Sequence, residues 1–406
     1  MIRIIEGDCR AALKTLADNS VHTCVTSPPY YGLRDYGTAQ WDGGDAGCDH
    51  KHPLRMRSAN STLDQGADYA AMSFGNYRDI CGKCGARRID AQLGLEASPD
   101  EWIAEMVAVF REVRRVLRSD GTLWLNVGDS YNANQGSGCF DTNGDGGGKK
   151  RFTHTPKMNT GLAPKQLLMM PARLALALQA DGWWLRSDII WAKPNPMPES
   201  VTDRPTSAHE HVFLLSKSAR YFYDADAVRD EAEYGRRNWS AGRNCRNVWT
   251  IATEAFPQSH YATMPTELAE RCIKAGTSER GCCAKCGAPW VRQTERNVAF
   301  TSGSGRAGNV PAGKYLGAEQ ALSGSYDIRM GPSVSSTTTG WAPSCTCEAP
   351  TRPCTVLDPF AGAGTTCLVA DRLQRHSIGI ELNPAYCTMA RNRIAQDAGM
   401  FAEVAD

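Results

Sequence analysis

The chain has 406 residues, of which 42% are hydrophobic and 22% charged, so it can bury a large core in one domain with insertions or in two domains. Its 45 Lys and Arg against 44 Asp and Glu leave a net charge of +1, which excludes a global positive field as the means of holding a polyanion. Met1–Asp8 lacks the apolar core of a signal peptide, and about 18 uninterrupted apolar residues occur nowhere, so we expect a cytoplasmic protein without a membrane partner. Sixteen cysteines then favour metal ligands and buried thiols over disulfides.

Short strands are predicted first, in residues 1–37. Ile2–Ile5 and Val21–Val25 are apolar runs of strand length, and the second leads directly into a proline loop. Residues 38–92 differ in character, because they are rich in Gly, Asp and Ser and have few apolar runs. We expect them to form an insertion.

A helix is predicted after the insertion, behind a capping-box pair. Ser98 and Glu101 have the spacing of such a pair, Pro99 suits the first helical position, and apolar residues then recur at helical spacing. Thr122–Val127 should form a buried strand. A helix followed by a strand is the rhythm of an α/β domain.

The same domain should continue through residues 93–225. Within it, residues 131–160 are rich in Gly, Asn, Asp and Lys and predict a mobile loop. Three elements are expected after this loop: a helix over Leu167–Ala180 and strands over Trp183–Trp191 and His211–Leu215.

The last third of the chain contains a second cysteine-rich stretch, residues 277–352. Within it, residues 300–343 are rich in Gly, Ser and Thr and are expected to form a loop. Residues 353–406 should return to the α/β domain with a strand, a glycine loop leading into a helix, and a second strand. These lie at Thr355–Leu357, Asp358–Thr366 and Ile378–Leu382.

The glycine loop has the setting of a nucleoside site. It follows a β-branched run and precedes a helical one, so its glycines would let the backbone approach a ligand. Glu381 ends the next strand, where a carboxylate can accept hydrogen bonds from both hydroxyls of a ribose. Thr365 and Thr366 stand where a third glycine would complete a pyrophosphate seat, which argues against NAD and suits S-adenosylmethionine. A tight structural turn is the alternative interpretation.

The loop Ser27-Pro28-Pro29-Tyr30 suits the binding of an amino group. Two prolines fix two φ angles and remove two N–H donors, so the loop is stiff and presents carbonyl oxygens. The Ser27 hydroxyl and the Pro28 carbonyl could hold the two hydrogens of an amino group, while Tyr30 stacks on the base. Such positioning is most of the catalysis in a direct displacement. The alternative is a proline turn with a packed tyrosine.

Together the two loops resemble those of the DNA amino-methyltransferases, which methylate adenine N6 or cytosine N4. The order, catalytic loop first and glycine loop last, resembles the permuted β group of that family. The likeness covers about two thirds of the chain, apart from residues 38–92, 131–160 and 277–352. It includes four further segments: Glu6-Gly7-Asp8, Asp120-Gly121-Thr122-Leu123, Arg204-Pro205-Thr206 and His260-Tyr261-Ala262-Thr263-Met264-Pro265.

This resemblance implies a Rossmann-like, doubly wound α/β sheet, circularly permuted, that methylates a base flipped out of double-stranded DNA. Ser27, Pro28, Pro29 and Tyr30 would be the catalytic residues, and residues 257–276 would line the methionine end of the cofactor. Eight residues would hold S-adenosylmethionine: Asp8, Asp358, Phe360, Gly362, Gly364, Thr365, Glu381 and Asn383. A homodimer and a cognate restriction endonuclease are further partners compatible with a bacterial or phage enzyme of this class.

Two cysteine clusters predict structural zinc sites in zinc-ribbon-like insertions. Cys-Gly-Lys-Cys-Gly begins at Cys81 and Cys-Ala-Lys-Cys-Gly at Cys283, and each has a possible second half elsewhere in its insertion. The predicted ligand sets are Cys48, His50, Cys81 and Cys84, and Cys283, Cys286, Cys345 and Cys347. His52 could replace His50, and Cys282 could replace Cys283. Reduced, unligated thiols are the alternative.

The resemblance makes residues 226–256 the candidate target-recognition region, because they lie where the family keeps that region. Their alternating arginines and aromatic residues suit phosphates and guanine edges. A solvated basic surface is the alternative. Lys149–Arg151 is a second candidate, as a phosphate clamp. Ser27 stands where many adenine-specific relatives carry Asp, which slightly favours cytosine N4 over adenine N6.

Two other kinds of function remain open at this point, and a third is set aside. Methylation of RNA or of a protein amide uses similar loops, and a zinc-ribbon DNA-binding protein with an inert pocket would not bind S-adenosylmethionine. Cytosine-C5 methylation needs a Pro-Cys nucleophile, for which Pro353-Cys354 is a candidate. Cys354 precedes the cofactor strand instead of following it, so we interpret it as structural.

Overall fold

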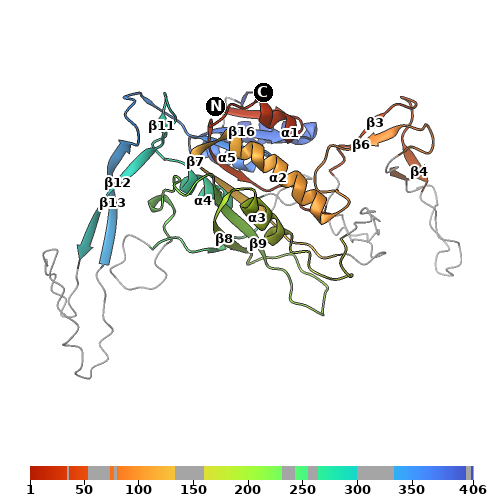
Figure 1. The fold of residues 1–406 in the computed structure, drawn as a ribbon, viewed down its shortest axis with the longest axis horizontal. Coiled ribbons are helices and arrows are strands. Elements are labelled where there is room, and N and C mark those ends of the chain that lie inside the picture. The colour runs from red at the N-terminus through yellow and green to blue at the C-terminus, as the bar shows by residue number, and fades with distance from the viewer. Residues whose placement is uncertain are drawn as a thin grey trace, which may run out of the picture.

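The fold is built on one large mixed sheet (Figure 1). The computed structural model describes residues 1–33, 36–53, 74–76, 80–132, 160–230, 243–254, 264–299, 333–398 and 404–405. The nine strands lie in the order β10-β8-β9-β7-β2-β15-β16-β1-β17. In chain order their bounds are β1 Ile2–Glu6, β2 Val21–Thr26, β7 Leu117–Val127, β8 Trp184–Ala192, β9 His209–Ser216, β10 Val248–Thr250, β15 Thr355–Asp358, β16 His376–Glu381 and β17 Val404–Ala405.

Strand β9 runs against its neighbours, while the other pairs in the sheet are parallel. The carboxyl ends of the parallel strands therefore share one edge of the sheet with the amino end of β9. Loops that follow β2, β7, β8, β15 and β16 meet at this edge, which is where ligands bind in open α/β sheets.

Helices cover both faces of the sheet, so the predicted doubly wound architecture is confirmed. One hydrophobic cluster includes α1 (Cys9–Ala12), α2 (Pro99–Val116) and α3 (Met170–Ala180). The other includes α4 (Thr266–Gly276), α5 (Thr365–Arg372) and α6 (Pro384–Ala398). Two short 3₁₀ helices complete the set, one at Leu13–Thr15 directly after α1 and one at Asp226–Val228 between β9 and β10. Within the described residues, no helix is long and apolar enough to cross a membrane.

The helix predicted behind Ser98 is confirmed as α2. The Ser98 hydroxyl accepts from the backbone N–H of Glu101 at 3.3 Å, and the Glu101 carboxylate accepts from the N–H of Ala97 at 3.1 Å, so the box closes one residue earlier than usual. Its apolar face is fully buried, with Trp102 and Phe110 both at 0% exposure. Burying an aromatic side chain of this size contributes about 1.5–3 kcal/mol, which anchors the helix to the sheet.

The two cysteine-rich segments form small two-stranded units at opposite ends of the sheet (Figure 1). The first contains β3 (Gln40–Asp42) paired with β6 (Arg87–Ile89) and β4 (Lys51–Pro53) paired with β5 (Phe74–Asn76). The second contains β11 (Cys282–Cys283) paired with β14 (Thr351–Arg352), and the longer hairpin β12 (Trp290–Ala299) with β13 (Ser333–Pro343).

The expectation of a loop over residues 300–343 is wrong for its last part. Residues 333–343 form β13, which pairs along its whole length with β12. A run rich in Ser and Thr carries little hydrophobic pattern, but threonine suits a strand once a partner strand supplies the hydrogen bonds. Residues 300–332 lie outside the described residues, as do residues 133–159 of the predicted mobile loop.

Strands β2 and β15 lie side by side in the middle of the sheet and join the two ends of the chain. The Thr26 hydroxyl donates to Asp358 Oδ1 at 2.6 Å, across 332 positions of sequence. The Thr366 hydroxyl donates to the Val25 carbonyl at 3.2 Å. All of these side chains are buried. The proline loop after β2 and the glycine loop after β15 are therefore held next to each other.

Replacing Thr26 by valine should destabilise the fold. The change keeps the shape of the side chain but removes a donor from the buried Asp358 carboxylate, which we expect to cost about 1–3 kcal/mol in the free energy of unfolding. Thr388→Val on α6, where the hydroxyl is exposed, should change that free energy by less than about 0.5 kcal/mol. Urea unfolding measures both, and equal effects of the two variants would show that the Thr26 bond has no special weight.

Candidate active site

The loop Ser27–Tyr30 leaves the carboxyl end of β2 and is fixed from the side of α2. The Trp102 indole donates to the Pro29 carbonyl at 3.1 Å, and the N–H of Gly32 donates to the Gly94 carbonyl at 2.8 Å. Among the described residues, none donates a hydrogen bond to the Pro28 carbonyl oxygen. The loop is thus held rigidly while one of its carbonyl oxygens keeps its accepting capacity.

The Tyr30 hydroxyl is the centre of a polar network on this loop. It accepts from the Ser27 hydroxyl at 3.1 Å and donates to Glu210 Oε2 at 2.7 Å. Asn126 Nδ2 donates to the same carboxylate oxygen at 3.0 Å, and the Lys193 ammonium forms an ion pair with the other. Burial raises the pKa of Tyr30 well above its ordinary value, and the nearby Glu210 charge adds to the rise. Tyr30 therefore stays protonated and acts as a donor.

Asn126, Lys193 and Glu210 are site residues that the sequence did not reveal. They come from β7, from the loop after β8 and from the start of the reversed strand β9, so that three strands supply them. Asn126 is the one polar residue in the apolar run Leu123–Val127, which is a signal that could have found it. For Lys193 and Glu210 no local pattern exists.

The glycine loop and Glu381 form the second half of the site. Glu381 accepts through one oxygen from the N–H of Gly362 and through the other from the N–H of Asn383, each at 2.8 Å. Burial raises the pKa of Glu381 above its ordinary value. Gly362 and Gly364 have φ values of +51° and +74°, a conformation that glycine adopts without strain. The loop geometry therefore depends on these two residues.

The other predicted cofactor residues lie around the same edge. Asp358, whose pKa burial raises, also accepts from the N–H of Phe360 at 3.1 Å. Thr365 begins α5, and its hydroxyl accepts from Arg393 at 2.8 Å. The structure thus brings the predicted residues of the carboxyl-terminal loop together beside the proline loop.

Asp8 follows β1, the strand that pairs with β16. Its carboxylate accepts from the backbone N–H of Arg10 at 2.8 Å and forms an ion pair with the Arg10 guanidinium at 2.7 Å. Partial burial would raise the pKa of Asp8, but the contacts with Arg10 outweigh it and hold that pKa below its ordinary value. Asp8 therefore stays ionised near Glu381, although Arg10 already occupies part of its accepting capacity.

Both predicted metal tetrads are assembled. Within each set of four, the candidate ligand atoms lie within 4.8 Å of one another. In the first, the Sγ atoms of Cys48 and Cys81 are 3.7 Å apart, and Cys84 Sγ lies 3.5 Å from His50 Nδ1. Cys283, and not Cys282, belongs to the second tetrad with Cys286, Cys345 and Cys347.

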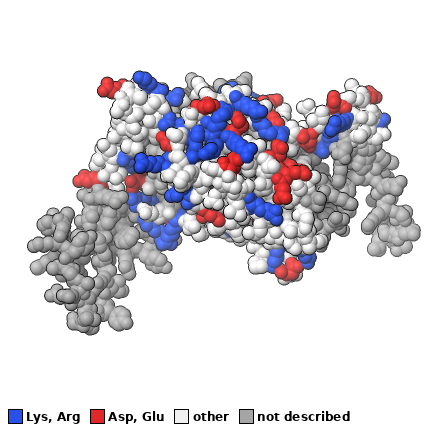
Figure 2. Space-filling model, in the orientation of Figure 1, with Lys and Arg blue, Asp and Glu red and all other residues white. Residues whose placement is uncertain are grey.

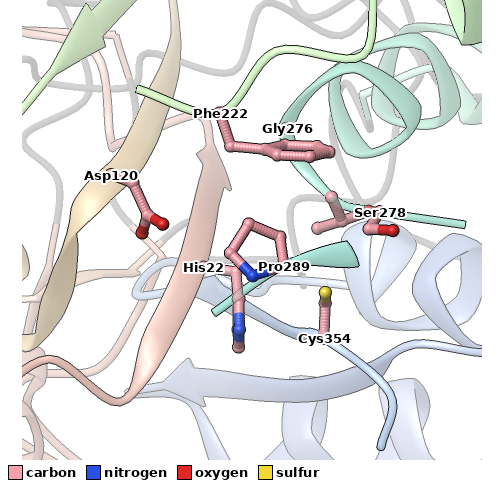
Figure 3. Close-up of a pocket in the computed structure, with 8 residues that line it drawn as sticks. His22, Asp120, Phe222, Gly276, Ser278, Pro289 and Cys354 are labelled. Carbon is pink, nitrogen blue, oxygen red and sulfur yellow. The ribbon is translucent and has the colours of Figure 1, made fainter. Parts of the chain in front are cut away.

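Cys282 lies instead in a third buried group with His22 and Cys354, beside the pocket drawn in Figure 3. Both ring nitrogens of His22 have backbone partners, because Nε2 donates to the Gly287 carbonyl at 2.9 Å and Nδ1 accepts from the N–H of Thr355 at 3.0 Å. This group lies at the amino end of β2, away from Ser27. The full burial of Cys354 there fits our interpretation of it as structural.

The comparisons with known proteins agree with this geometry. A family model described as DNA methylase, of the N6/N4 type, matches residues 21–284 and 353–392. The chain belongs to the N6/N4 DNA methylase family. It is an S-adenosylmethionine-dependent DNA methyltransferase, as the two assembled loops predict.

Curated relatives match almost the whole chain. The Type II methyltransferase M.Cfr9I of Citrobacter freundii is 34% identical over 392 residues, which cover 96% of this chain and 87% of the relative. M.SmaI of Serratia marcescens is 33% identical over 393 residues, covering 97% and 90%. Among solved structures, the cytosine-N4-specific PvuII DNA methyltransferase matches with a TM-score of 0.49 and 14% identity, covering 100% of this chain and 95% of that one.

The candidate DNA-contacting region of this methyltransferase is described only in part. Within residues 226–256, Trp249 is buried beneath the Arg271 guanidinium, so it is a core residue and not a base contact. Arg229 forms an ion pair with Asp226. The remaining candidates in residues 231–242, and Lys149–Arg151, lie outside the described residues.

A basic patch in the middle of the face in Figure 2 lies near the end of α2. Of the arginines on α2, Arg111 pairs with Asp181, and Arg115 pairs with Glu112 and Asp18. The charges therefore largely cancel, in keeping with the net charge of +1. Because α2 ends where β7 begins, this patch also lies at the sheet edge opposite Ser27.

Gly128→Ala should slow methyl transfer without weakening cofactor binding. A Cβ atom at Gly128 would lie 2.6 Å from Cε2 of Tyr30, so the tyrosine ring would have to move. We expect kcat to fall about tenfold to a hundredfold, because a displacement of this size disturbs the alignment of reacting groups. Gly340→Ala is the control, since its Cβ atom would meet only Gln293 Oε1 at 3.5 Å. Transfer of labelled methyl groups to DNA and calorimetric binding of S-adenosylmethionine measure the two properties; an unchanged rate would contradict the role of Tyr30.

Proposed function

We propose that this DNA methyltransferase transfers a methyl group to the exocyclic amino group of a base flipped out of double-stranded DNA, with cytosine N4 favoured over adenine N6. The buried hydrogen bond between Thr26 and Asp358 carries this proposal, because it places the amino-binding loop beside the glycine loop. Ser27, in place of the Asp of many adenine-specific relatives, is the reason for favouring cytosine.

The hydrogen bonds of the proline loop suit an amino group as ligand. The Ser27 hydroxyl gives its own proton to Tyr30, so its lone pairs are left to accept one amino hydrogen. The Pro28 carbonyl would accept the other. With both hydrogens directed to these acceptors, the nitrogen lone pair points away from them, toward the side on which the glycine loop lies.

S-adenosylmethionine supplies an electrophilic methyl group when bound. In the proposed displacement, the bond from the base nitrogen to the methyl carbon would form as the sulfur–carbon bond breaks and S-adenosylhomocysteine leaves. The nitrogen would then lose its extra proton to solvent. Glu381, whose oxygens each accept one backbone N–H, retains lone pairs for the two ribose hydroxyls. Glu210, held by Lys193 and Asn126, fixes the orientation of Tyr30.

Incubation with unmethylated bacterial DNA and labelled S-adenosylmethionine, followed by nuclease digestion and mass spectrometry of nucleosides, tests the function. Labelled N4-methylcytosine supports the proposal in full, and labelled N6-methyladenine supports the reaction but changes the base. No labelled nucleoside despite binding of the cofactor would overturn the DNA substrate and point to RNA or protein. Absence of cofactor binding would favour an inert zinc-ribbon DNA-binding protein.

The partners follow from the same proposal. The relatives are named Type II methyltransferases, which supports a restriction-modification role with a cognate endonuclease. The homodimer remains a prediction, as do the domain boundaries drawn from the sequence.

Ser27→Ala should reduce kcat by about tenfold to a hundredfold, the worth of one hydrogen bond to a group that becomes charged, and leave the affinity for S-adenosylmethionine unchanged. The variant removes one of the two amino acceptors without touching the glycine loop. Ser20→Ala, whose hydroxyl bonds only the nearby Ala17 carbonyl, is the control. Equal losses in rate and in cofactor affinity would remove the role assigned to Ser27.

We also propose structural zinc in both tetrads. Zinc–sulfur bonds of about 2.3 Å at tetrahedral angles place two sulfurs about 3.8 Å apart, which agrees with the 3.7 Å between Cys48 and Cys81. Four protein ligands leave no open position for chemistry, so these sites would stabilise insertions that have small apolar cores.

Metal analysis of the purified protein should find about two zinc ions per chain. Cys84→Ser and Cys286→Ser should each release about one of them, because each breaks one tetrad. Cys245→Ser is a matched control, since Cys245 is partly exposed and belongs to neither tetrad. Intact protein that contains no zinc would end the proposal, and loss of zinc in the control alone would place the metal elsewhere.

A further inference from the structure

The loop that follows β8 presents an exposed methionine on a stiff backbone. Lys193-Pro194-Asn195-Pro196-Met197-Pro198 alternates proline with other residues, so that three φ angles in six positions are fixed. Met197 is 71% exposed, the highest value among the large hydrophobic side chains that the structure describes. An apolar side chain that is exposed to water in this way contributes little burial to the stability of the fold.

The same loop is braced at both ends. Asn195 Oδ1 accepts from the N–H of Thr253 at 2.9 Å, and the N–H of Lys193 donates to the Ala208 carbonyl at 2.8 Å. Further along, the Arg204 guanidinium lies 3.9 Å from the centre of the Tyr131 ring. These contacts attach the loop to the segments that follow β10 and β7. The backbone that carries Met197 is therefore held in place by the rest of the fold.

The loop also begins in the active site. Lys193, four residues before Met197, forms the ion pair with Glu210, whose other oxygen accepts from Tyr30. The exposed methionine and the residues around the proposed amino-binding loop are therefore connected by a short stretch of constrained chain. Val201, 40% exposed, extends the apolar character of the same loop.

We propose that Met197 enters the base stack of the DNA duplex at the position that the target base leaves. This inference rests on the proposed function, since only a flipped base leaves such a gap. Flipping costs a few kcal/mol of lost stacking and pairing. Other DNA-binding proteins insert apolar side chains, methionine among them, between base steps. A methionine adapts to an irregular apolar gap, and the prolines lower the entropy lost when the loop binds.

The test compares two duplexes that contain the methylation site, once that site has been mapped in DNA modified by the wild-type enzyme. One duplex is fully paired, and in the other the target base is mispaired, which lowers the cost of flipping. For Met197→Ala we expect kcat/KM to fall about tenfold on the paired duplex, equivalent to 1.36 kcal/mol, but less than about twofold on the mispaired one. Met197→Leu should retain most of the activity on both.

Leu176→Ala is the matched control, because Leu176 is 63% exposed on α3 and its truncation should leave both duplexes unaffected. Equal losses on the two duplexes, or no loss on the paired one, would overturn the role of Met197 while leaving the proposed function intact. If wild-type enzyme leaves no methylated site to map in bacterial DNA, the proposed function is overturned instead, and this inference with it.

Discussion

The hydrogen bond from Thr26 to Asp358 is the contact on which the rest of the site depends. The chain order places the proline loop near one end and the glycine loop near the other, so only the pairing of β2 with β15 can bring them together. A shift of this pairing by one residue would point Thr26 to the other face of the sheet and leave a buried carboxylate without its donor. The hydrogen bond between Thr26 and Asp358 thus helps to specify the register of β2 with β15, and this register brings the two loops together.

The two insertions are hydrogen-bonded to the strands and loops that carry the site. The second contacts the amino end of β2, where Gly287 accepts from His22, and the start of β7, where the Cys286 carbonyl accepts from Arg118 at 2.7 Å. The first begins just beyond Tyr30 and returns through Gln92, which accepts from the N–H of Tyr36 at 2.7 Å. Tyr36 in turn accepts from Asn383 at 3.3 Å, beside the glycine loop. Each insertion is therefore attached to one half of the site.

The two loops could be predicted because each is a run of neighbouring residues whose chemistry depends on local spacing. Both tetrads could be predicted because each combines two closely spaced pairs of ligand residues from one insertion. The sequence predicted His50 and Cys283 with His52 and Cys282 as alternatives, and the folded backbone brings the two predicted residues into the tetrads. Glu210 escaped prediction because β9 runs against its neighbours, and this reversal brings the strand's beginning to the edge where other strands end. Strand β13 was missed because its own sequence lacks a hydrophobic alternation; its hydrogen-bonding partners come from β12.

The Lys193–Glu210 pair explains how a half-buried carboxylate can lie near a base that becomes positively charged in the proposed reaction. Without a partner, the charge of Glu210 would be costly to remove from water. It would also attract the amino group of the base away from the acceptors Ser27 and Pro28. Paired with Lys193 and bonded by Asn126 and Tyr30, it has little net field and a fixed orientation. Breaking one member of such a set leaves an uncompensated charge, whereas the complete set mainly confers geometry. In the proposed reaction, orientation of Tyr30 and Ser27 is therefore the contribution of this network, and the charge that develops on the base is met by Ser27 and the Pro28 carbonyl.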